Sequence, residues 1–193
     1  MELLLEWGDG LHALALAVAL AACAGLRAWL PLLLSGLLAR AGYLELGDSF
    51  GFLSSDRALL AFAVATLLEM TADKIPAVDH ALDVVSTVAR PAAGALIAAS
   101  VIGRVSDPLT SIALGIAVGA PSALAPHAAK SLLRAAATTL TGGLANPVLS
   151  LIEDITAVGL FALALLVPLL VVAALGILVL AIWRRRRRVV SPA

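Results

Sequence analysis

The sequence predicts an all-α fold: a polytopic helical membrane bundle of about six spans, with some helices short or broken. Hydrophobic residues make up 62% of the 193 residues and charged residues only 13%, and the mean hydropathy is +1.05. In a typical soluble domain, roughly a quarter of all residues are charged. In lipid only helices and closed barrels satisfy the backbone polar groups. The runs of Ala, Leu, Val and Ile lack the strict alternation of a barrel, so the spans are helical.

The apolar runs are the candidate spans, and several are near or below the roughly 20 residues that a perpendicular helix needs. They cover about 11–39, 58–75, 92–103, 109–126, 128–140, 147–166 and 168–183. The last two runs could form one long, kinked span or two shorter ones, and the sequence leaves both arrangements open.

Turn signals separate several of these runs. Residues 40–57 are rich in glycine and charge and form the one clearly hydrophilic loop. Asp107-Pro108 and Gly142-Gly143 mark two further turns. Asn146 before Pro147 predicts a helix that begins with Asn146 as N-cap and with the proline at the first helical position.

Three prolines lie beside charged residues: Pro76, Pro91 and Pro126. A proline removes a backbone donor and disfavours helix in the residue before it. We therefore predict that Ile75-Pro76 ends the helix before it, that residues 79–88 form a separate short helix, and that the other two prolines mark further breaks.

The two ends of the chain set the expected orientation. Residues 1–183 are expected to form a single transmembrane domain and residues 184–193 a polybasic cytoplasmic tail. Five arginines, 184–188, follow the apolar run that ends at Trp183, and the positive-inside rule places such a block in the cytoplasm. Recruitment of anionic lipid is an alternative role for it. An even number of spans would place both ends in the cytoplasm.

A weak internal echo suggests two halves. A long segment with Arg27 precedes the helix with Glu69, and a segment with Lys130 precedes the helix with Glu153. If each half holds three helices, the halves form an inverted repeat, an arrangement common in secondary transporters. Arg27 lies in the middle of its apolar run and is a candidate partner for the acids.

The first candidate site residues are Glu69, Asp73 and Lys74. Glu69 and Asp73 are four residues apart and share one face of a helix. Two carboxylates in hydrocarbon need a nearby cation or donor, and Lys74 points about 100° away around the helix. We predict that these acids lie deep in the bundle and bind a cation or a proton.

Asp79 is a further candidate, on the segment that follows Pro76. Asp79 and Asp83 repeat the four-residue spacing, and His80 lies between them. One interpretation is a broken or re-entrant element with an ion site. The alternative is an amphipathic helix at the membrane surface with solvated charges. No four-ligand metal spacing is present, so whether a metal binds is left open.

The basic candidates are His127, Lys130 and Arg134, which form one stripe on a helix at i, i+3 and i+7. Buried charges are rarely left alone, so we predict that this stripe pairs with the buried acids. The remaining candidates are Glu153 and Asp154, about two turns into the helix that begins near Pro147.

Five segments carry a family resemblance: AGLRAWLPLL, EMTADKIPAVD, ARPAAGAL, PHAAKSLLR and ANPVLSLIEDI. The chain resembles, over roughly residues 15–185, a family of small bacterial integral membrane proteins known as a domain of unknown function, family four-one-two-six. Members often have Asn-x-Ser-Pro-Glu-Pro before the last acidic helix, and this chain retains Asn146-Pro147 without that acid. The resemblance implies an architecture and a choice of site, without an activity.

The expected function is that of a transporter or channel-like protein for a small ion or polar solute in the bacterial cytoplasmic membrane. The intramembrane carboxylates and the basic stripe would form its binding site. The alternatives are a non-transporting structural or assembly protein and, third, a membrane-embedded enzyme acting on lipid headgroups. Since no nucleophile or metal motif is present, we expect that the protein is not an enzyme and binds no cofactor. The expected partners are membrane lipid and the solute, and not nucleic acid.

Overall fold

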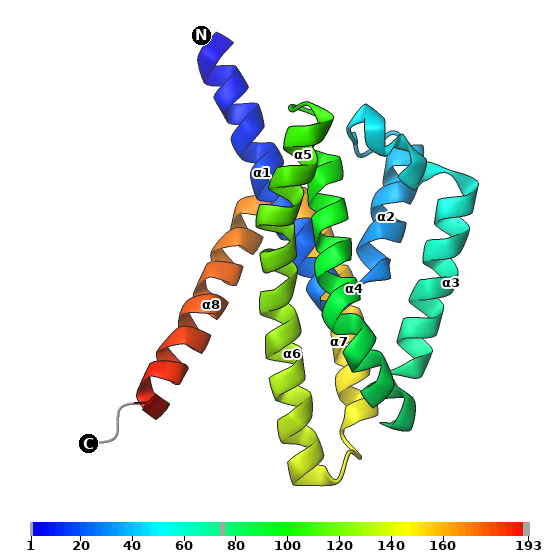
Figure 1. Cartoon of the computed structure of the whole chain (residues 1–193), viewed down its shortest axis with the longest axis vertical. Helices are drawn as coiled ribbons and strands as arrows, with labels where there is room; N and C mark the ends of the chain where they lie inside the picture. Colours follow the sequence, from blue (N-terminus) through cyan, green and yellow to red (C-terminus); the bar gives the residue numbers. More distant parts are fainter. Residues whose placement is uncertain (1, 74–75, 191–193) are drawn as a thin grey trace.

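The computed structural model describes residues 2–73 and 76–190, and almost all of these residues are helical, with no strand among them. The helices form a bundle from which the beginning of α1 and most of α8 extend (Figure 1). In chain order the elements are α1 (Glu2–Leu26), α2 (Trp29–Arg40), the 3₁₀ helix η1 (Asp48–Ser54), α3 (Asp56–Ala72), α4 (Pro76–Ile102), α5 (Pro108–Leu114), the π-helical turn η2 (Gly115–Gly119), α6 (Ala120–Thr141), α7 (Asn146–Leu166) and α8 (Pro168–Val190).

Within the described residues, four helical segments are long and apolar enough to cross a membrane. A fifth is added if η1 and α3, which meet at 59°, count as one bent span. The four segments are Asp9–Leu26, Val85–Ile102, Pro108–Thr141 and Asn146–Leu166. These helices confirm the predicted helical bundle with several candidate membrane spans, of which the described residues hold four or five in place of about six.

The first apolar run, which was expected to be one continuous segment, is broken in its middle. α1 ends at Leu26, and α2 begins at Trp29 and runs back in the opposite direction (Figure 1). The 12 residues of α2 span about 18 Å, less than the roughly 30 Å of a bilayer core. The break therefore places the end of one helix and the beginning of another inside the bundle, where Arg27 is fully buried.

The prolines behave differently from one another. The break before Pro76 is confirmed, since α3 ends at Ala72 and α4 begins at Pro76. The predicted short helix over residues 79–88 is wrong, because α4 continues through Pro91 to Ile102. The predicted break at Pro126 is also wrong, since this residue lies inside α6. A proline removes one hydrogen bond, whereas a complete break in lipid leaves several backbone groups unpaired.

Small residues bring the central helices close together. A Cβ atom added to Gly25 of α1 would overlap the carbonyl oxygen of Ala123 of α6. A Cβ atom at Gly94 of α4 would lie 2.8 Å from the Gly119 carbonyl oxygen. Such close packing is typical of membrane helices, whose interfaces use small residues. It holds the end of α1 firmly between α4 and α6, where the candidate site lies.

The predicted turns are confirmed, with one correction. Asp107 caps α5 by accepting hydrogen bonds from the backbone N–H groups of Leu109 and Thr110, both at 3.1 Å. α6 ends before Gly142, whose φ of +62° suits glycine. Ala145, rather than Asn146, holds the N-cap position of α7, and the Asn146 side-chain amide donates to the Thr138 hydroxyl at 3.1 Å.

The two last apolar runs form two separate helices. α7 ends at Leu166, and α8 starts at Pro168 and runs back along the molecule (Figure 1). The beginning of α1 and the end of α8 lie at opposite ends of the bundle's long axis (Figure 1). The expectation that both chain ends lie on the same side of the membrane does not fit this arrangement.

Candidate functional site

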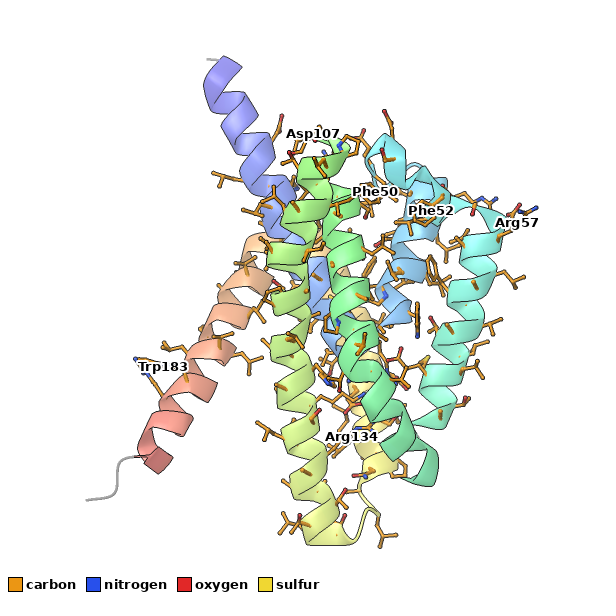
Figure 2. The ribbon with its side chains drawn as sticks, viewed as in Figure 1. Phe50, Phe52, Arg57, Asp107, Arg134 and Trp183 are labelled. Atoms are coloured by element: carbon orange, nitrogen blue, oxygen red, sulfur yellow. The ribbon has the colours of Figure 1, made fainter. Side chains whose placement is uncertain are left out.

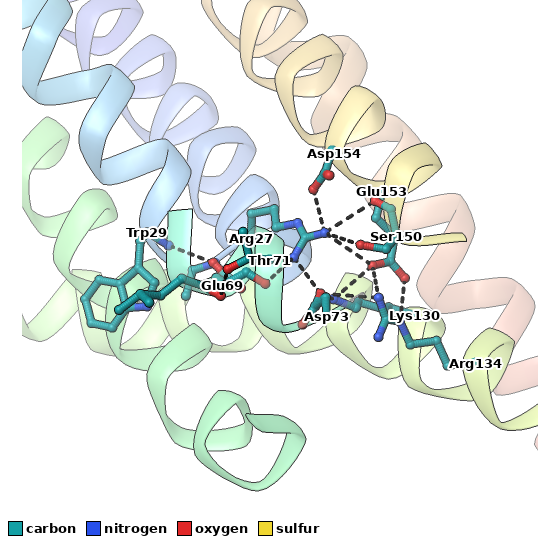
Figure 3. Close-up of polar contacts among 12 residues, drawn as sticks. Arg27, Trp29, Glu69, Thr71, Asp73, Lys130, Arg134, Ser150, Glu153 and Asp154 are labelled. Carbon is teal, nitrogen blue, oxygen red and sulfur yellow. Dashed lines mark hydrogen bonds and ion pairs between the residues drawn. The ribbon is translucent and has the colours of Figure 1, made fainter. Parts of the chain in front are cut away.

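Eight charged side chains from four helices and one helix break meet inside the bundle, and we call them the charge network. Four are basic and four are acidic, so the network is neutral when all are ionised. Figure 3 shows most of its contacts. Its members are Arg27, Glu69, Asp73, Arg90, Lys130, Arg134, Glu153 and Asp154.

Arg27 lies at the centre of the network, just after the end of α1. Its guanidinium pairs with Asp73 of α3 and with Asp154 of α7, at 2.5 Å in each case. It also donates to the Ser150 hydroxyl at 3.1 Å and to the Ser150 carbonyl oxygen at 3.3 Å. Because the side chain is 0% exposed, these groups replace the water that a guanidinium otherwise requires.

Glu69 caps a helix to which it does not belong. Its carboxylate accepts hydrogen bonds from the backbone N–H of Ala28 at 3.1 Å and of Trp29 at 3.5 Å. These groups lie at the beginning of α2, where Ala28, the N-cap residue, offers no side-chain cap. The helix dipole also favours a negative charge there. The carboxylate of α3 therefore stabilises the break between α1 and α2.

Asp73 joins three basic residues through one oxygen. Its Oδ2 lies 3.0 Å from the Lys130 ammonium, 3.2 Å from the Arg134 guanidinium and 2.5 Å from Arg27. Asp73 is the C-cap residue of α3, so the end of this helix places the carboxylate between α1 and α6. The predicted pairing of this acid with Lys130 and Arg134 is confirmed.

Glu153 of α7 completes the pairing of α6. Arg134 donates to both of its carboxylate oxygens, at 3.0 and 2.8 Å, in a bidentate arrangement. The Lys130 ammonium lies 3.0 Å from Glu153 Oε2. Such two-point pairs are among the stronger and more directional ion pairs in proteins, so they fix α7 against α6.

Arg90 of α4 links Glu69 to the remaining basic candidate. Its Nη1 lies 2.5 Å from Nδ1 of His127, and its Nη2 lies 3.5 Å from Oε1 of Glu69. The side chain is fully buried. Contact with a guanidinium, which only donates, requires that His127 Nδ1 accepts.

Two cavities flank the charge network. The first, of about 470 Å³, lies between α2, α3 and α4, and we call it the α3 cavity; Glu69, Trp29 and Ser86 line it. The second, of about 270 Å³, lies between α1, α6, α7 and α8, and we call it the α8 cavity; Lys130 and Glu153 line it among mostly apolar residues.

Comparison with known protein families found a match over most of the chain. The family model described as "Domain of unknown function (DUF4126)" matches residues 14–188. The chain belongs to the DUF4126 family. No curated protein and no solved structure matches it. The DUF4126 match contains every residue of the charge network.

The candidate residues of this DUF4126 chain fall into two groups. The structure brings together those on α3, α6 and α7: Glu69, Asp73, His127, Lys130, Arg134, Glu153 and Asp154. The others cannot be placed in the network. Lys74 lies outside the described residues, and Asp79 lies on the first turn of α4 with its side chain outside the described part.

No group of three or more His, Cys, Asp or Glu that could hold a metal ion occurs among the described residues. The carboxylates of the network face basic side chains instead. The site thus has the chemistry to hold an ion or a polar solute by exchange with one of its own charged groups.

Two residues of the DUF4126 chain have a larger part in the network than their sequence context predicted. Arg90 was not a candidate, and Arg27 was only a possible partner, yet both are fully buried in the network. The signal was present, because an arginine in an apolar run at membrane depth is costly and rarely without a role. Ser150, which accepts from Arg27 through its carbonyl oxygen, carried no comparable signal.

Proposed function

We propose that the protein is a membrane transporter or channel-like protein for a small ion or polar solute, and that the charge network is its binding site. The observation that carries this proposal is the position of the network between the α3 cavity and the α8 cavity. Glu69 lines the first, and Lys130 and Glu153 line the second.

A continuous series of contacts connects the two cavities. From the α3 cavity, the Glu69 backbone carbonyl accepts from Arg27 at 3.5 Å, and Arg27 pairs with Asp73. Asp73 then meets Lys130 at 3.0 Å, and Lys130 meets Glu153 at 3.0 Å in the lining of the α8 cavity. These distances are short, so a bound ion or polar solute could pass from one group to the next with small side-chain movements.

Energetics favour a functional role over a purely structural one. A buried ion pair contributes little net stability, and well-packed apolar residues often serve as well or better. Eight charged groups at membrane depth are therefore a costly way to join helices. Transport supplies a reason to retain them.

The helix breaks support the same proposal. Two breaks, between α1 and α2 and between α3 and α4, lie at the network. Discontinuous helices whose ends face the binding site are a recurring device of secondary transporters. The break at Arg27 exposes backbone N–H groups at the site that an unbroken helix would use internally.

For orientation, we propose that the protein lies in the bacterial cytoplasmic membrane with the arginines of α8 in the cytoplasm. The beginning of α1, at the other end of the bundle (Figure 1), then faces the outside.

Flux through reconstituted vesicles tests the proposal. The vesicles carry gradients of H⁺, Na⁺, K⁺, chloride or formate, and internal dyes or tracers report their decay. Wild-type protein is expected to speed the decay of at least one gradient, and Glu69→Gln and Asp73→Asn to reduce that rate by about tenfold or more. Glu45→Gln is the matched control, since this carboxylate lies on the exposed loop. Decay equal to that of protein-free vesicles for every ion would leave the structural role in its place.

A further inference from the structure

The beginning of α2 is occupied by a negative group that the chain itself supplies. Glu69 Oε1 lies 3.1 Å from the Ala28 nitrogen, and Oε2 lies 3.5 Å from the Trp29 nitrogen. Helix N-termini of this kind bind phosphate, sulfate or carboxylate groups, because free N–H groups and the helix dipole act together. The side chain of Glu69 occupies the place of such an anion.

Arg90 provides an independent sign of an anion site. Its guanidinium is 0% exposed, and Nη2 lies 3.5 Å from Glu69 Oε1. Among the described residues, neither Nη2 nor Nε has a hydrogen-bond partner. A buried guanidinium with unused donors is costly, and Nη2 lies beside the position that the Glu69 carboxylate occupies.

The α3 cavity gives access to this position. Its lining includes Ala28 and Trp29, which carry the two N–H groups, together with Glu69 and the Ser86 hydroxyl group. The cavity volume of about 470 Å³ leaves room for the Glu69 side chain to turn away from α2 while a small ion takes its place. α3, which carries Glu69, is the peripheral helix beside this cavity (Figure 1).

We propose that the beginning of α2, with Arg90, is a binding site for a small monovalent anion, which competes with the Glu69 carboxylate for the same N–H and guanidinium groups. The inference rests on the proposed transport function and names its substrate class. The Glu69 side chain turns into the α3 cavity as the anion enters from there. One negative group thus replaces another at the N–H groups of α2. The charged and titratable groups around the position are Arg27, Asp73, Arg90 and, behind Arg90, His127.

Trp29 offers a direct probe, because its backbone N–H group is part of the proposed site and the residue also lines the α3 cavity. In a Trp7→Phe/Trp183→Phe protein, its fluorescence reports binding of formate or chloride, with gluconate holding the ionic strength constant. Saturable binding is expected. In Glu69→Gln the neutral amide competes less well than a carboxylate, so the anion should bind about tenfold more tightly.

Two further variants complete the test. Arg90→Gln removes the guanidinium, and we expect anion affinity to fall about tenfold or more. Where Arg90→Gln does not yield monodisperse protein, Arg90→Lys replaces it, with an intermediate loss. Glu45→Gln, the same chemical change on the exposed loop, is expected to leave affinity unchanged. Stronger binding of formate than of chloride would identify the site as one for carboxylates, and the reverse order as one for halides.

The outcomes separate this inference from the proposed function. The inference is overturned if folded Glu69→Gln binds neither anion saturably, or binds them no more tightly than wild type. If H⁺, Na⁺ or K⁺ flux persists in that case, the transport proposal stands without an anion site. If the anions bind as expected and no ion crosses the vesicle membrane, the transport proposal fails and the α2 site is one for binding only.

Discussion

The carboxylate of Glu69 lies 3.1 Å from the backbone nitrogen of Ala28, 41 residues earlier in the chain, and caps the helix that begins there. A tertiary contact thus stabilises the point at which an apolar run of the sequence stops being helical. The same contact joins α3, on the edge of the bundle, to the break at its centre. The stability of the break and the position of the Glu69 carboxylate should therefore depend on each other.

Replacement of Arg27 should show how strongly the network holds the fold. Arg27→Gln removes the guanidinium that pairs with Asp73 and Asp154 in a fully buried position. Losing one partner of a buried ion pair costs about 3–5 kcal/mol. The free energy of unfolding in mild detergent measures this loss.

Arg40 provides the matched control for Arg27. It pairs with Asp56 at the surface, where the two side chains are 50% and 86% exposed. Exposed pairs contribute about 0–1 kcal/mol, so Arg40→Gln should change the free energy of unfolding little. Equal losses for the two variants would contradict the burial of Arg27 in a paired network.

Gly25 should tolerate no side chain. A Cβ atom there would overlap the Ala123 carbonyl oxygen, so Gly25→Ala should force α1 away from α6 and lower the thermal stability. Gly159 of α7 has open space around its Cβ position, and Ala is the better helix former by about 1 kcal/mol. Gly159→Ala should therefore leave the melting temperature unchanged or raise it. Equal melting temperatures for the two variants would exclude the close contact of α1 with α6.

Asp107, in the turn before the long α5–α6 helix, should make stability depend on pH. A hydrogen bond from the Thr110 side chain, together with bonds from the backbone N–H groups of Thr110 and Leu109, lowers the pKa of this carboxyl group below its ordinary value. A lowered pKa in the folded state means that the cap stabilises the protein fully above the ordinary pKa of about 4. This contribution is lost as the pH falls through the lowered value.

Thermal melts of wild type and Asp107→Ala at pH 7 and pH 3 test this dependence. The variant should melt at a lower temperature at pH 7, and the difference should shrink at pH 3. A difference that grows on acidification would show that the folded state does not favour the ionised carboxyl group.

Thiol labelling tests the arrangement of the loops. Tyr43 and Leu144 are exposed, and their loops lie at opposite ends of the bundle (Figure 1). In a Cys23→Ala background, a membrane-impermeant maleimide should label Tyr43→Cys on intact cells. It should label Leu144→Cys only after the membrane is opened, because the arginines of α8, which we propose to be cytoplasmic, lie at the same end of the bundle. Labelling of both cysteines on intact cells would refute the arrangement.

Composition was enough to predict the fold class, because an apolar chain in lipid has few structural options. The turns at Asp107 and Gly142 were predictable for a similar reason, since capping and positive φ are local properties. The break at Arg27 was not predictable in this way. Glu69 on another helix caps it, and the local signals, Gly25 before the break and Pro31 in the first turn of α2, do not by themselves specify where α1 ends.

The site was predictable as a set of charges and only partly as a set of pairs. Charge balance at membrane depth correctly joined Asp73 to Lys130 and Arg134. It did not reveal that Arg90 separates Glu69 from this stripe, because partner choice depends on helix packing. Side chains across the fold illustrate the same point, since Arg134 is buried whereas Arg57 extends from the surface (Figure 2). The inverted repeat stays a prediction, and Arg27 at a break differs from Lys130 inside α6.

The most direct test of the central claim is ion flux through the charge-balanced variant Lys130→Gln/Glu153→Gln. These two side chains pair at 3.0 Å and line the α8 cavity. Each single change leaves a buried charge without one of its partners, whereas the double change keeps the network neutral and should recover most of the lost stability. If the network is the transport site, this stable variant will conduct about tenfold less than wild type, or less still. Wild-type flux through the folded double variant would contradict the account.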